Sequence, residues 1–545
     1  MLLILFYYLF LVVFLVPFGT FAERILRIRN NSFAITLLLG IVFQTALLTI
    51  SAFFFRLNIE VFIGNVILYL FLLFWQKWDI KTKLIILKSE FSSWQSFFKI
   101  LFLIMVILVL AKSSLLPFII DNESYYLQTI KWFNEYGFVK GLGNLHIYLA
   151  QGSPWQVLQA GLNFSFFTDV INDINGFVFI VCTFFYLNEY HKQNRQTWII
   201  YILVFNVLIF QFLDSPSPDL PILVLLPILF YWFIFQKNSK TAILFFVFLV
   251  FIKIILAPFV LLFLFWKLDP INRRYLVLTG LFFAILWVVK NSILSGYPLY
   301  PFTYFSLDVD WRTPEAILFI ATVPENVGVF VQSTQWFSTV GSKLLFWIQM
   351  SGIAGIFNQS ILLLFILFPF TKSFREGKQY KILYFIMLLH FVILLFTSPQ
   401  FRFFLPEIFF FGAVIIREIV ALIDKKNRLR KWIILSGVVL PLIFLFPMHL
   451  DNLTSNINHQ ATDSFEIKQI LKPKPSSKFY AWEYEKKQRG NLEYYSPKGE
   501  EFFNVGNGKL PCITDSFLDY IERNFQIVPQ LRTSDIRDGF FSKPL

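Results

Sequence analysis

Apolar runs of about twenty residues recur along this 545-residue chain, and most charged residues lie in short segments between them. Hydrophobic residues make up 57% of the sequence and charged residues 15%, whereas soluble domains carry about 25% charged residues. Such runs are long enough to cross a bilayer as helices. They are continuous and lack the period-two alternation of membrane barrels, so helices must satisfy their backbone in lipid. The sequence therefore predicts an all-α polytopic membrane protein.

The number of these runs leads us to expect about 12–14 transmembrane helices. The stretch 241–266 is ambiguous, because it is long enough for one tilted helix but has Lys253 at its centre, followed by Pro258. The first run lacks a basic segment and a cleavage site, so we interpret it as a span and not as a signal peptide. Besides the stretch 241–266, the expected spans are 1–19, 33–55, 59–75, 97–117, 168–188, 197–213, 220–236, 275–294, 354–370, 379–397, 403–423 and 431–448.

Basic residues set the expected orientation, because loops rich in Lys and Arg remain cytoplasmic. If all of them are cytoplasmic, the segment between Lys240 and Lys267 must enter and leave the membrane on one side. Two half-length helices would do this and would place Lys253 near their tip, toward the external face. The formal charge of +13 then reflects orientation and not nucleic-acid binding. The basic clusters are Arg24/Arg27/Arg29, Lys77/Lys81/Lys83, Lys192/Arg195, Lys237/Lys240, Lys267/Arg273/Arg274, Lys372/Arg375/Lys378/Lys381 and Lys425/Lys426/Arg428/Arg430/Lys431.

This topology divides the chain into three parts. Residues 1–96 form N-terminal transmembrane helices, and residues 97–450 form a transmembrane core with large external loops at 118–167 and 295–353. The short segments 214–219 and 398–402 are external as well. Residues 451–545 are polar and form a small external C-terminal region, in which 516–528 has the pattern of an amphipathic helix.

The first polar motif on the external face is Asp121-Asn122-Glu123, directly after a span that ends at Pro117. The residues after it fit a helix lying in the interface plane, with Tyr126, Leu127, Ile130 and Phe133 on its apolar face. Asp121 could simply cap this helix, with Glu123 as a first-turn acid. The functional alternative is a carboxylate at the membrane surface that takes a proton from an acceptor hydroxyl.

Three further charged residues are expected at or near that face. Asp219, in the motif Ser-Pro-Ser-Pro-Asp-Leu-Pro, is either a first-turn acid of the next span or a second acid beside Asp121. Lys253 at mid-membrane is disfavoured by about 2.5–3.5 kcal/mol, which favours a functional role over snorkelling. Arg402, in the turn Pro399-Gln-Phe-Arg-Phe403, either anchors the interface or binds a phosphate with its planar fork.

Other polar residues carry weaker signals. His146 is a lone loop histidine, either structural or in contact with substrate, and Lys290 ends a span before an aromatic, proline-containing run. The five histidines are scattered, so no metal-ligand spacing appears. Cys182 and Cys512 are not expected to pair, since one lies in an apolar run and the other in the tail.

With these residues in place, the chain resembles the GT-C superfamily of polytopic glycosyltransferases, which use polyprenyl-phosphate sugar donors. The resemblance covers residues 97–450. The run 122–146 and the tail pieces KLPC (509–512) and IRDGFF (536–541) are similar to a group of uncharacterised bacterial multi-pass membrane proteins related to that superfamily. The features that carry it are Asp121 and Glu123 in the first large external loop, the interfacial helix, Asp219 before a proline, the short re-entrant pair with Lys253, and Arg402-Phe403.

The resemblance implies transfer of a hexosyl or pentosyl group from a polyprenyl-phosphate donor to a cell-envelope glycan, lipid or protein, at the external face of the inner membrane. A lipid-phosphate donor already has a good leaving group, so catalysis needs a base and positive charge. We expect Asp121 as the base, with Glu123 or Asp219 orienting the acceptor. Lys253 and Arg402 would hold the phosphate, and His146 and Lys290 are further substrate-contact candidates. A divalent metal would suit converging acids and a phosphate, although the chemistry does not require one.

Other classes of protein remain open. A transporter or flippase of lipid-linked glycans should show charges in several helix centres and a repeat between halves, whereas here Lys253 alone is central and no repeat is visible. A polysaccharide polymerase would share the large external loops but would rely on Arg- and His-rich loops more than on paired acids. A non-catalytic envelope assembly protein is the third alternative.

Overall fold

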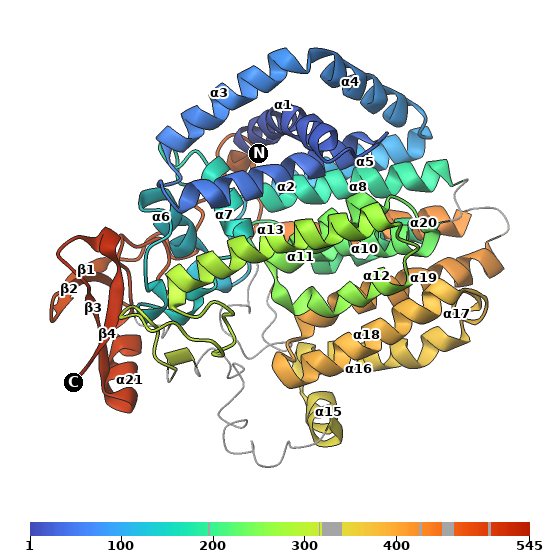
Figure 1. The fold of residues 1–545 in the computed structure, drawn as a ribbon. Coiled ribbons are helices and arrows are strands. Elements are labelled where there is room, and N and C mark those ends of the chain that lie inside the picture. Colours follow the sequence, from blue (N-terminus) through green and yellow to red (C-terminus); the bar gives the residue numbers. More distant parts are fainter. Residues whose placement is uncertain (194–196, 316, 319–339, 425–427, 449–462, 500–502) are drawn as a thin grey trace.

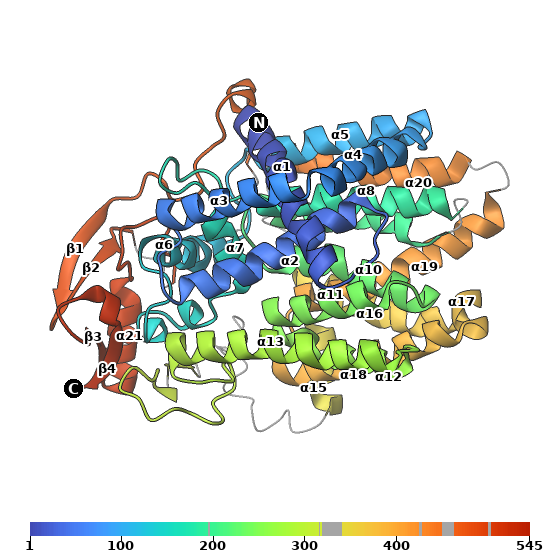
Figure 2. The ribbon, with the colours of Figure 1, turned by 45° about the horizontal axis from the view of Figure 1, so that its top comes forward.

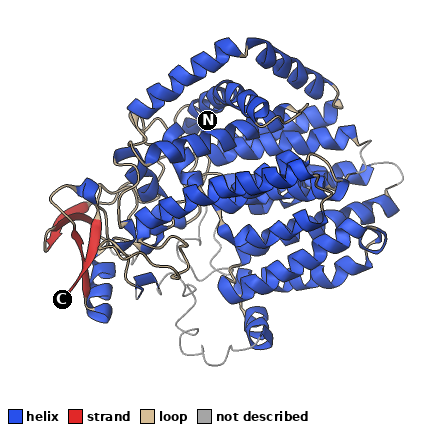
Figure 3. Ribbon diagram, in the orientation of Figure 1, coloured by secondary structure: helices blue, strands red, loops and turns tan. Residues whose placement is uncertain are grey.

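The structure is a computed structural model that describes residues 1–193, 197–315, 317–318, 340–424, 428–448, 463–499 and 503–545. These residues are mostly helical, and the strands lie in the C-terminal region (Figure 3). Arg195, Lys425, Lys426 and much of the expected loop 295–353 lie outside the described residues.

The N-terminal helices pack at one side of the bundle. Helices α1 and α2 are antiparallel neighbours, and α3 and α4 lie outside them, joined at a bend of 84° (Figure 1). Helix α5 follows and packs on α8, at the start of the central layer. The bounds are α1 Leu2–Ile25, α2 Phe33–Ala52, α3 Ile59–Trp75, α4 Lys77–Ser92 and α5 Ser96–Lys112.

The remaining helices build the rest of the bundle, and many of them run side by side (Figure 2). Central elements are α8 Ile174–Lys192, η4 Ile199–Phe205, α9 Asn206–Ile209, η5 Phe210–Phe212, α10 Asp219–Phe235, α11 Ser239–Ile252, η6 Ile254–Leu261, α12 Leu262–Phe265 and α13 Pro270–Ser295. The later ones are α15 Val340–Gln349, α16 Gly352–Leu367, η8 Phe368–Phe370, α17 Lys372–Glu376, α18 Lys378–Thr397, η9 Phe401–Phe404, α19 Leu405–Ile423, α20 Arg428–Val439 and η10 Leu440–Leu445.

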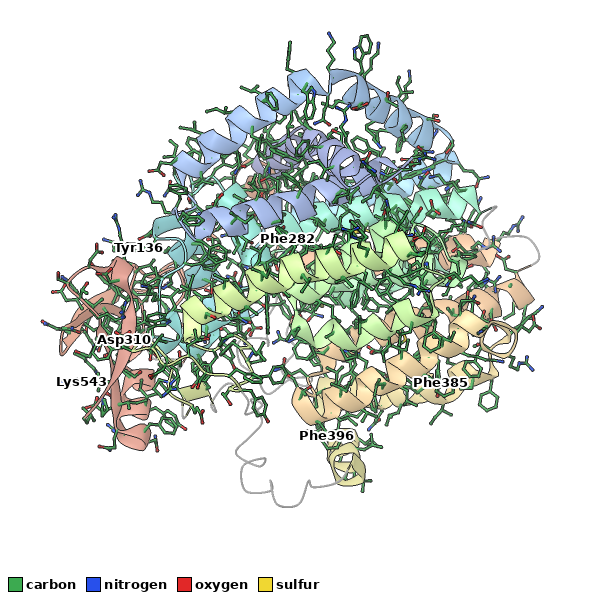
Figure 4. The ribbon with its side chains drawn as sticks, viewed as in Figure 1. Tyr136, Phe282, Asp310, Phe385, Phe396 and Lys543 are labelled. Atoms are coloured by element: carbon green, nitrogen blue, oxygen red, sulfur yellow. The ribbon has the colours of Figure 1, made fainter. Side chains whose placement is uncertain are left out.

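Length and composition would allow five of the described helical segments to cross a bilayer, or six if the bent pair α3–α4 is counted as one span. The outer faces of such segments carry exposed apolar side chains, including Phe282 on α13 and Phe385 on α18 (Figure 4). An exposed apolar face is stable where lipid covers it, which agrees with the expected helical membrane protein. The five segments are α1, α2, α13, Gly352–Phe370 and α18.

The ambiguous stretch 241–266 forms two short helical segments and no continuous helix. Helix α11 ends at Ile252, and Lys253 has the extended conformation φ −150°, ψ 106°. A 3₁₀ segment, η6, begins at Ile254 and packs back on α11. The predicted interruption at Lys253 is therefore confirmed.

The polar loop region and the tail form a second, smaller core at one end of the bundle (Figure 1). The loop elements are η1 Asn122–Tyr126, α6 Leu127–Glu135, η2 Leu142–Asn144, η3 Ile147–Ala150 and α7 Pro154–Leu162. The tail elements are η12 Ile467–Ile470, β1 Tyr484–Arg489, β2 Leu492–Pro497, α21 Asp515–Phe525, β3 Ile527–Leu531, η13 Ile536–Asp538 and β4 Phe540–Pro544.

The expectation of an all-α chain is wrong for this tail. Strands β1 and β2 form an antiparallel hairpin, as do β3 and β4. The helix expected over 516–528 ends at Phe525, because Gln526 adopts a left-handed conformation and the chain continues as β3. Gly490 and Asn491 join β1 to β2 as a two-residue turn, and Gly-Asn between two strand-like runs is a sequence pattern typical of such turns.

The tail also covers α6. Leu127, Ile130 and Phe133 are buried as expected, but Gln128 on the opposite face is buried too. Its Nε2 donates to the carbonyl oxygens of Gly506 and Gly508, both at 3.1 Å. The tail therefore covers part of the polar face of α6, while Lys131 and Glu135 on that face are half-buried.

Close approach between α1 and α2 depends on two glycines. A Cβ at Gly40 would lie 2.4 Å from the backbone oxygen of Leu15, and one at Gly19 would lie 2.0 Å from that of Thr36. The backbones therefore pack directly against each other, as small residues allow in membrane helices.

We predict that Gly40→Ala lowers the free energy of unfolding by about 1–3 kcal/mol, because the added methyl forces the two helices apart. Thermal unfolding of the purified chain in detergent measures the effect. Gly64→Ala and Gly280→Ala are matched controls, since a Cβ there meets nothing within 4 Å. Both controls should be neutral or slightly stabilising, because Ala favours helices over Gly by about 1 kcal/mol. An unchanged unfolding temperature for Gly40→Ala would contradict the close packing.

Candidate site: a charge cluster built from four segments

Asp121 stands at the start of η1, a π-helical turn that leads directly into α6. Single π turns commonly occur at functional positions in helices. The Asp121 carboxylate accepts a hydrogen bond from Arg402 Nη1 at 2.6 Å and one from the Tyr126 hydroxyl at 3.3 Å. Two residues 281 positions apart in sequence thus meet directly.

Arg402 lies on η9, the short turn between α18 and α19. Its Nε donates to Gln400 Oε1 at 2.8 Å, which fixes the guanidinium relative to its own turn. The turn is held from outside by Trp347, whose Nε1 donates to the Pro399 carbonyl oxygen at 3.2 Å. The cation therefore sits on a supported backbone.

Asp219 and Lys253 complete the set. Asp219 begins α10 and forms an ion pair with Lys253, which sits at the break between α11 and η6. Asp219 Oδ2 also lies 3.6 Å from Arg402 Nη1, so Arg402 bridges the two acids. We refer to Asp121, Asp219, Lys253 and Arg402 as the charge cluster.

Two hydroxyl groups that we did not predict connect the acids. The Tyr126 hydroxyl lies 3.3 Å from Ser217 Oγ, and Ser217 Oγ accepts the backbone N–H of Asp219 at 3.3 Å. Asn175 on α8 holds this loop by donating from Nδ2 to the carbonyl oxygen of Ser217 at 3.0 Å. Tyr126 was predicted only as part of an apolar helix face. A Tyr beside an acidic motif also indicates a hydroxyl that can bind the acid.

The cluster balances two cations against two anions, and its cations are partly open. The side chains of Lys253 and Arg402 are 23% and 22% exposed, whereas Asp219 is almost fully buried. Burial alone would lower the pKa of Arg402, but Asp121 and Asp219 outweigh it and hold that pKa well above its ordinary value. The Lys253 ammonium also lies 4.1 Å from the centroid of the Phe403 ring, a favourable cation–π contact.

Glu123 does not join the charge cluster, which corrects its expected role beside Asp121. Its carboxylate accepts hydrogen bonds from the backbone N–H of Lys478 at 2.9 Å and from the hydroxyl of Ser477, both in the tail. Its backbone oxygen accepts the N–H groups of Val505 and Gly506. Burial raises the pKa of Glu123 despite these bonds. Glu123 therefore fastens the tail to the loop.

His146 and Lys290 are also placed in structural contacts. His146 is buried among Tyr148, Phe503 and Phe517, and burial lowers its pKa to about 3, so the ring is neutral at physiological pH. Its Nδ1 accepts the backbone N–H of Tyr148 at 3.3 Å. Lys290 Nζ donates to the Gln151 carbonyl oxygen at 2.7 Å. The structure does not bring either residue into contact with the charge cluster.

Two buried ion pairs escaped the sequence reasoning. Lys112 at the end of α5 pairs with Asp214, which also accepts the backbone N–H of Phe118 at 3.4 Å. His390 on α18 and Glu407 on α19 meet at 2.6 Å between Nδ1 and Oε1, and both are fully buried. The pairing of Lys112 with Asp214 could have been predicted, because both lie at span ends beside polar loops on the same face.

Among the described residues, no group of three or more His, Cys, Asp or Glu side chains is arranged to hold a metal ion. Both cysteines are free and buried, as their positions in sequence indicated.

The fold and the site together define a helical membrane-type protein with a partly buried charge cluster beside its polar end. Residues 1–410 match a family described as a domain of unknown function, DUF8201. The chain therefore belongs to that family. No curated protein and no solved structure matches it.

We predict that Asp121 and Arg402 are energetically coupled. Asp121→Asn and Arg402→Gln should each destabilise the chain, and the double variant should lose less than their sum, with a coupling energy of about 1–3 kcal/mol. The measurement is the free energy of unfolding in detergent of the wild type, the two single variants and the double variant, which together form a double-mutant cycle.

The matched control pairs Arg402→Gln with Asp515→Asn, a tail carboxylate that is bound to Lys487 and Tyr494. That pair should be additive to within about 0.5 kcal/mol. Additivity of the Asp121 and Arg402 variants would mean that the contact does not exist in solution.

Proposed function

We propose that this chain is a GT-C-type membrane glycosyltransferase that moves a sugar from a polyprenyl-phosphate donor to a cell-envelope acceptor. The observation that supports this proposal is the meeting of two acids and two cations from four separate polar motifs. The sequence predicts base and phosphate-binding roles for these same residues. A structural explanation of each one alone would not require them to be neighbours.

Lys253 and Arg402 suit the donor phosphate. A guanidinium can bind two phosphate oxygens at once, and a lysine adds a compact charge beside it. Both cations retain exposed surface, so a phosphate can reach them and replace part of their contact with Asp219 and Asp121. Positive charge at this position stabilises the phosphate as it leaves.

Asp121 is the proposed base. The acceptor oxygen attacks the anomeric carbon of the donor, and the bond from that carbon to the phosphate oxygen breaks with its electron pair on the phosphate. The acceptor proton passes to Asp121. Donor binding draws Arg402 toward the phosphate, which frees Asp121 Oδ2, while Tyr126 keeps the carboxylate in place. Asp219, buried against Lys253, orients the phosphate-binding lysine and the acceptor.

The proposed setting is the inner membrane of a bacterium, with the loop 118–167 and the tail on the external face. The basic clusters between spans support this orientation. The count of about 12–14 membrane helices requires that shorter apolar segments also enter the bilayer. Four of these segments are Ile199–Phe212, Asp219–Phe235, Ser239–Ile252 and Ile254–Phe265, and further helices such as α5, α8 and α19 must enter the bilayer as well.

One observation favours a second candidate, a non-catalytic assembly protein. Every member of the charge cluster is paired with another member, as in an ion-pair network that only joins helices. The two candidates differ in what loss of the Asp121 charge does. Both lose stability, because the pair with Arg402 is broken, but only a transferase also loses turnover.

We predict that Asp121→Asn lowers glycosyl transfer at least 100-fold, because a general base contributes about 10²–10⁴-fold. The assay measures release of polyprenyl phosphate from polyprenyl-phosphate-linked hexoses and pentoses by the purified chain, with cell-envelope lipid and polysaccharide fractions as acceptors. Asn keeps the size of the side chain, so the variant should still be expressed and inserted, although it is less stable than the wild type.

Asp515→Asn is the matched control and should leave transfer unchanged. Asp219→Asn should be less severe than Asp121→Asn. Normal transfer by Asp121→Asn would remove it as the base, and no release by the wild-type chain from any donor would favour the non-catalytic candidate.

A further inference from the structure

Helix α4 buries two charged side chains and exposes several large apolar ones. Its buried side chains include Lys83 and Glu90, whereas Trp78, Leu84 and Ile85 point outward. Trp78 is 70% exposed and Ile85 is 60% exposed. A surface helix in water buries most of its large apolar side chains, so this exposed apolar set favours a partner other than water beside α4.

The buried side of α4 is fixed to the bundle by charge. Lys83 Nζ lies 2.7 Å from Glu23 Oε2 and donates to the Asn30 carbonyl oxygen at 2.9 Å. Glu90 accepts the backbone N–H of Phe33 at 3.2 Å and pairs with Lys192 at 3.1 Å. These contacts hold the helix in one rotation, so the outward set of residues is a fixed surface.

The outward surface combines apolar and basic side chains. Lys77, Lys81, Leu84 and Lys88 follow one another at spacings of four, three and four residues, which places them along one stripe of the helix. Trp78 and Ile85 lie beside that stripe, seven residues apart. The Nζ atoms of Lys77 and Lys81 are 5.5 and 5.6 Å from the Trp78 ring centroid. We call these six residues the outer face of α4.

This surface carries no compensating acid of its own. Helix α4 contains two acids, and Asp79 pairs with Arg24 at 2.8 Å while Glu90 points into the bundle. The three lysines of the outer face therefore present net positive charge to whatever covers it. An anionic partner is the complement of that charge.

The neighbouring helix α3 favours a membrane surface as the partner. Helix α3 exposes Ile67, Phe71 and Phe74 on its outer side, a surface that suits lipid tails. Helix α4 meets α3 at a bend of 84° on the outside of the bundle (Figure 1), and its lysines suit the level at which the bilayer meets water. A helix at that level buries its apolar residues at the boundary with the acyl chains and extends its lysines to the headgroups.

We propose that the outer face of α4 is a binding surface for anionic phospholipid headgroups. Trp78, Leu84 and Ile85 insert at the acyl boundary, and Lys77, Lys81 and Lys88 contact the lipid phosphates. The surface is independent of the charge cluster, so it stands whether or not the chain is a glycosyltransferase. Anionic lipids would then bind the N-terminal helices through this surface.

The test measures, by native mass spectrometry, how tightly the full-length chain in detergent binds phosphatidylglycerol. Phosphatidylcholine is the reference lipid. The wild type should bind phosphatidylglycerol in preference. The variant K77Q/K81Q/K88Q should lose about 100-fold in affinity for phosphatidylglycerol and little for phosphatidylcholine, since each lysine near an anionic surface contributes about fivefold.

Two matched variants control for total charge. K77R/K81R/K88R keeps the charge and should keep the preference. K486Q/K509Q/K543Q removes three exposed lysines of the tail and should also keep it. Equal binding of the two lipids by the wild type, or loss of the preference in the tail variant, would overturn the proposal.

A second measurement places the helix even if the triple variant fails to fold. A spin label on Ile85→Cys in phosphatidylglycerol nanodiscs should be more accessible to oxygen than to a water-soluble nickel reagent. The two native cysteines are buried, so they leave this label distinct. Greater accessibility to nickel would show that α4 faces water and would overturn the proposal.

Discussion

Arg402 is the residue on which the arrangement of the site depends, because its guanidinium contacts acids from two different segments. It lies 2.6 Å from Asp121 and 3.6 Å from Asp219, and Asp219 in turn pairs with Lys253. The start of η1, the start of α10, the α11–η6 break and the η9 turn are thereby joined. Removing one partner of a buried pair costs about 3–5 kcal/mol, less where solvent reaches the pair. The cluster therefore both joins helices and keeps charge at one position.

The tail supports the same region from the other side. Glu123, two residues from Asp121, accepts hydrogen bonds from Ser477 and Lys478, while Gln128 on α6 donates to the tail backbone. The π turn that begins at Asn122 is thus held between the bundle and the tail. Adjacent acids in one motif have separate tasks here, since Asp121 faces the cations and Glu123 fastens the polar end.

The sequence predicted the cluster but not the details around it. Asp121, Asp219, Lys253 and Arg402 were expected together because the positive-inside rule orders loops by side, and loops on one side can meet. That rule does not say which way a side chain points, so Glu123 was grouped with Asp121. The break at Lys253 was predictable from charge on both flanks. The tail strands were not predicted, because they are short and β1 in particular carries many charged residues, although Gly490-Asn491 marks the turn of the first hairpin.

The most direct test of the account is an electron cryomicroscopy structure of the purified chain in nanodiscs with polyprenyl phosphate bound. The account predicts phosphate density in contact with both Lys253 Nζ and the Arg402 guanidinium, with the Asp121 carboxylate released from Arg402 and open toward that phosphate. Phosphate density elsewhere in the bundle, with the four charges still paired as they are here, would contradict it.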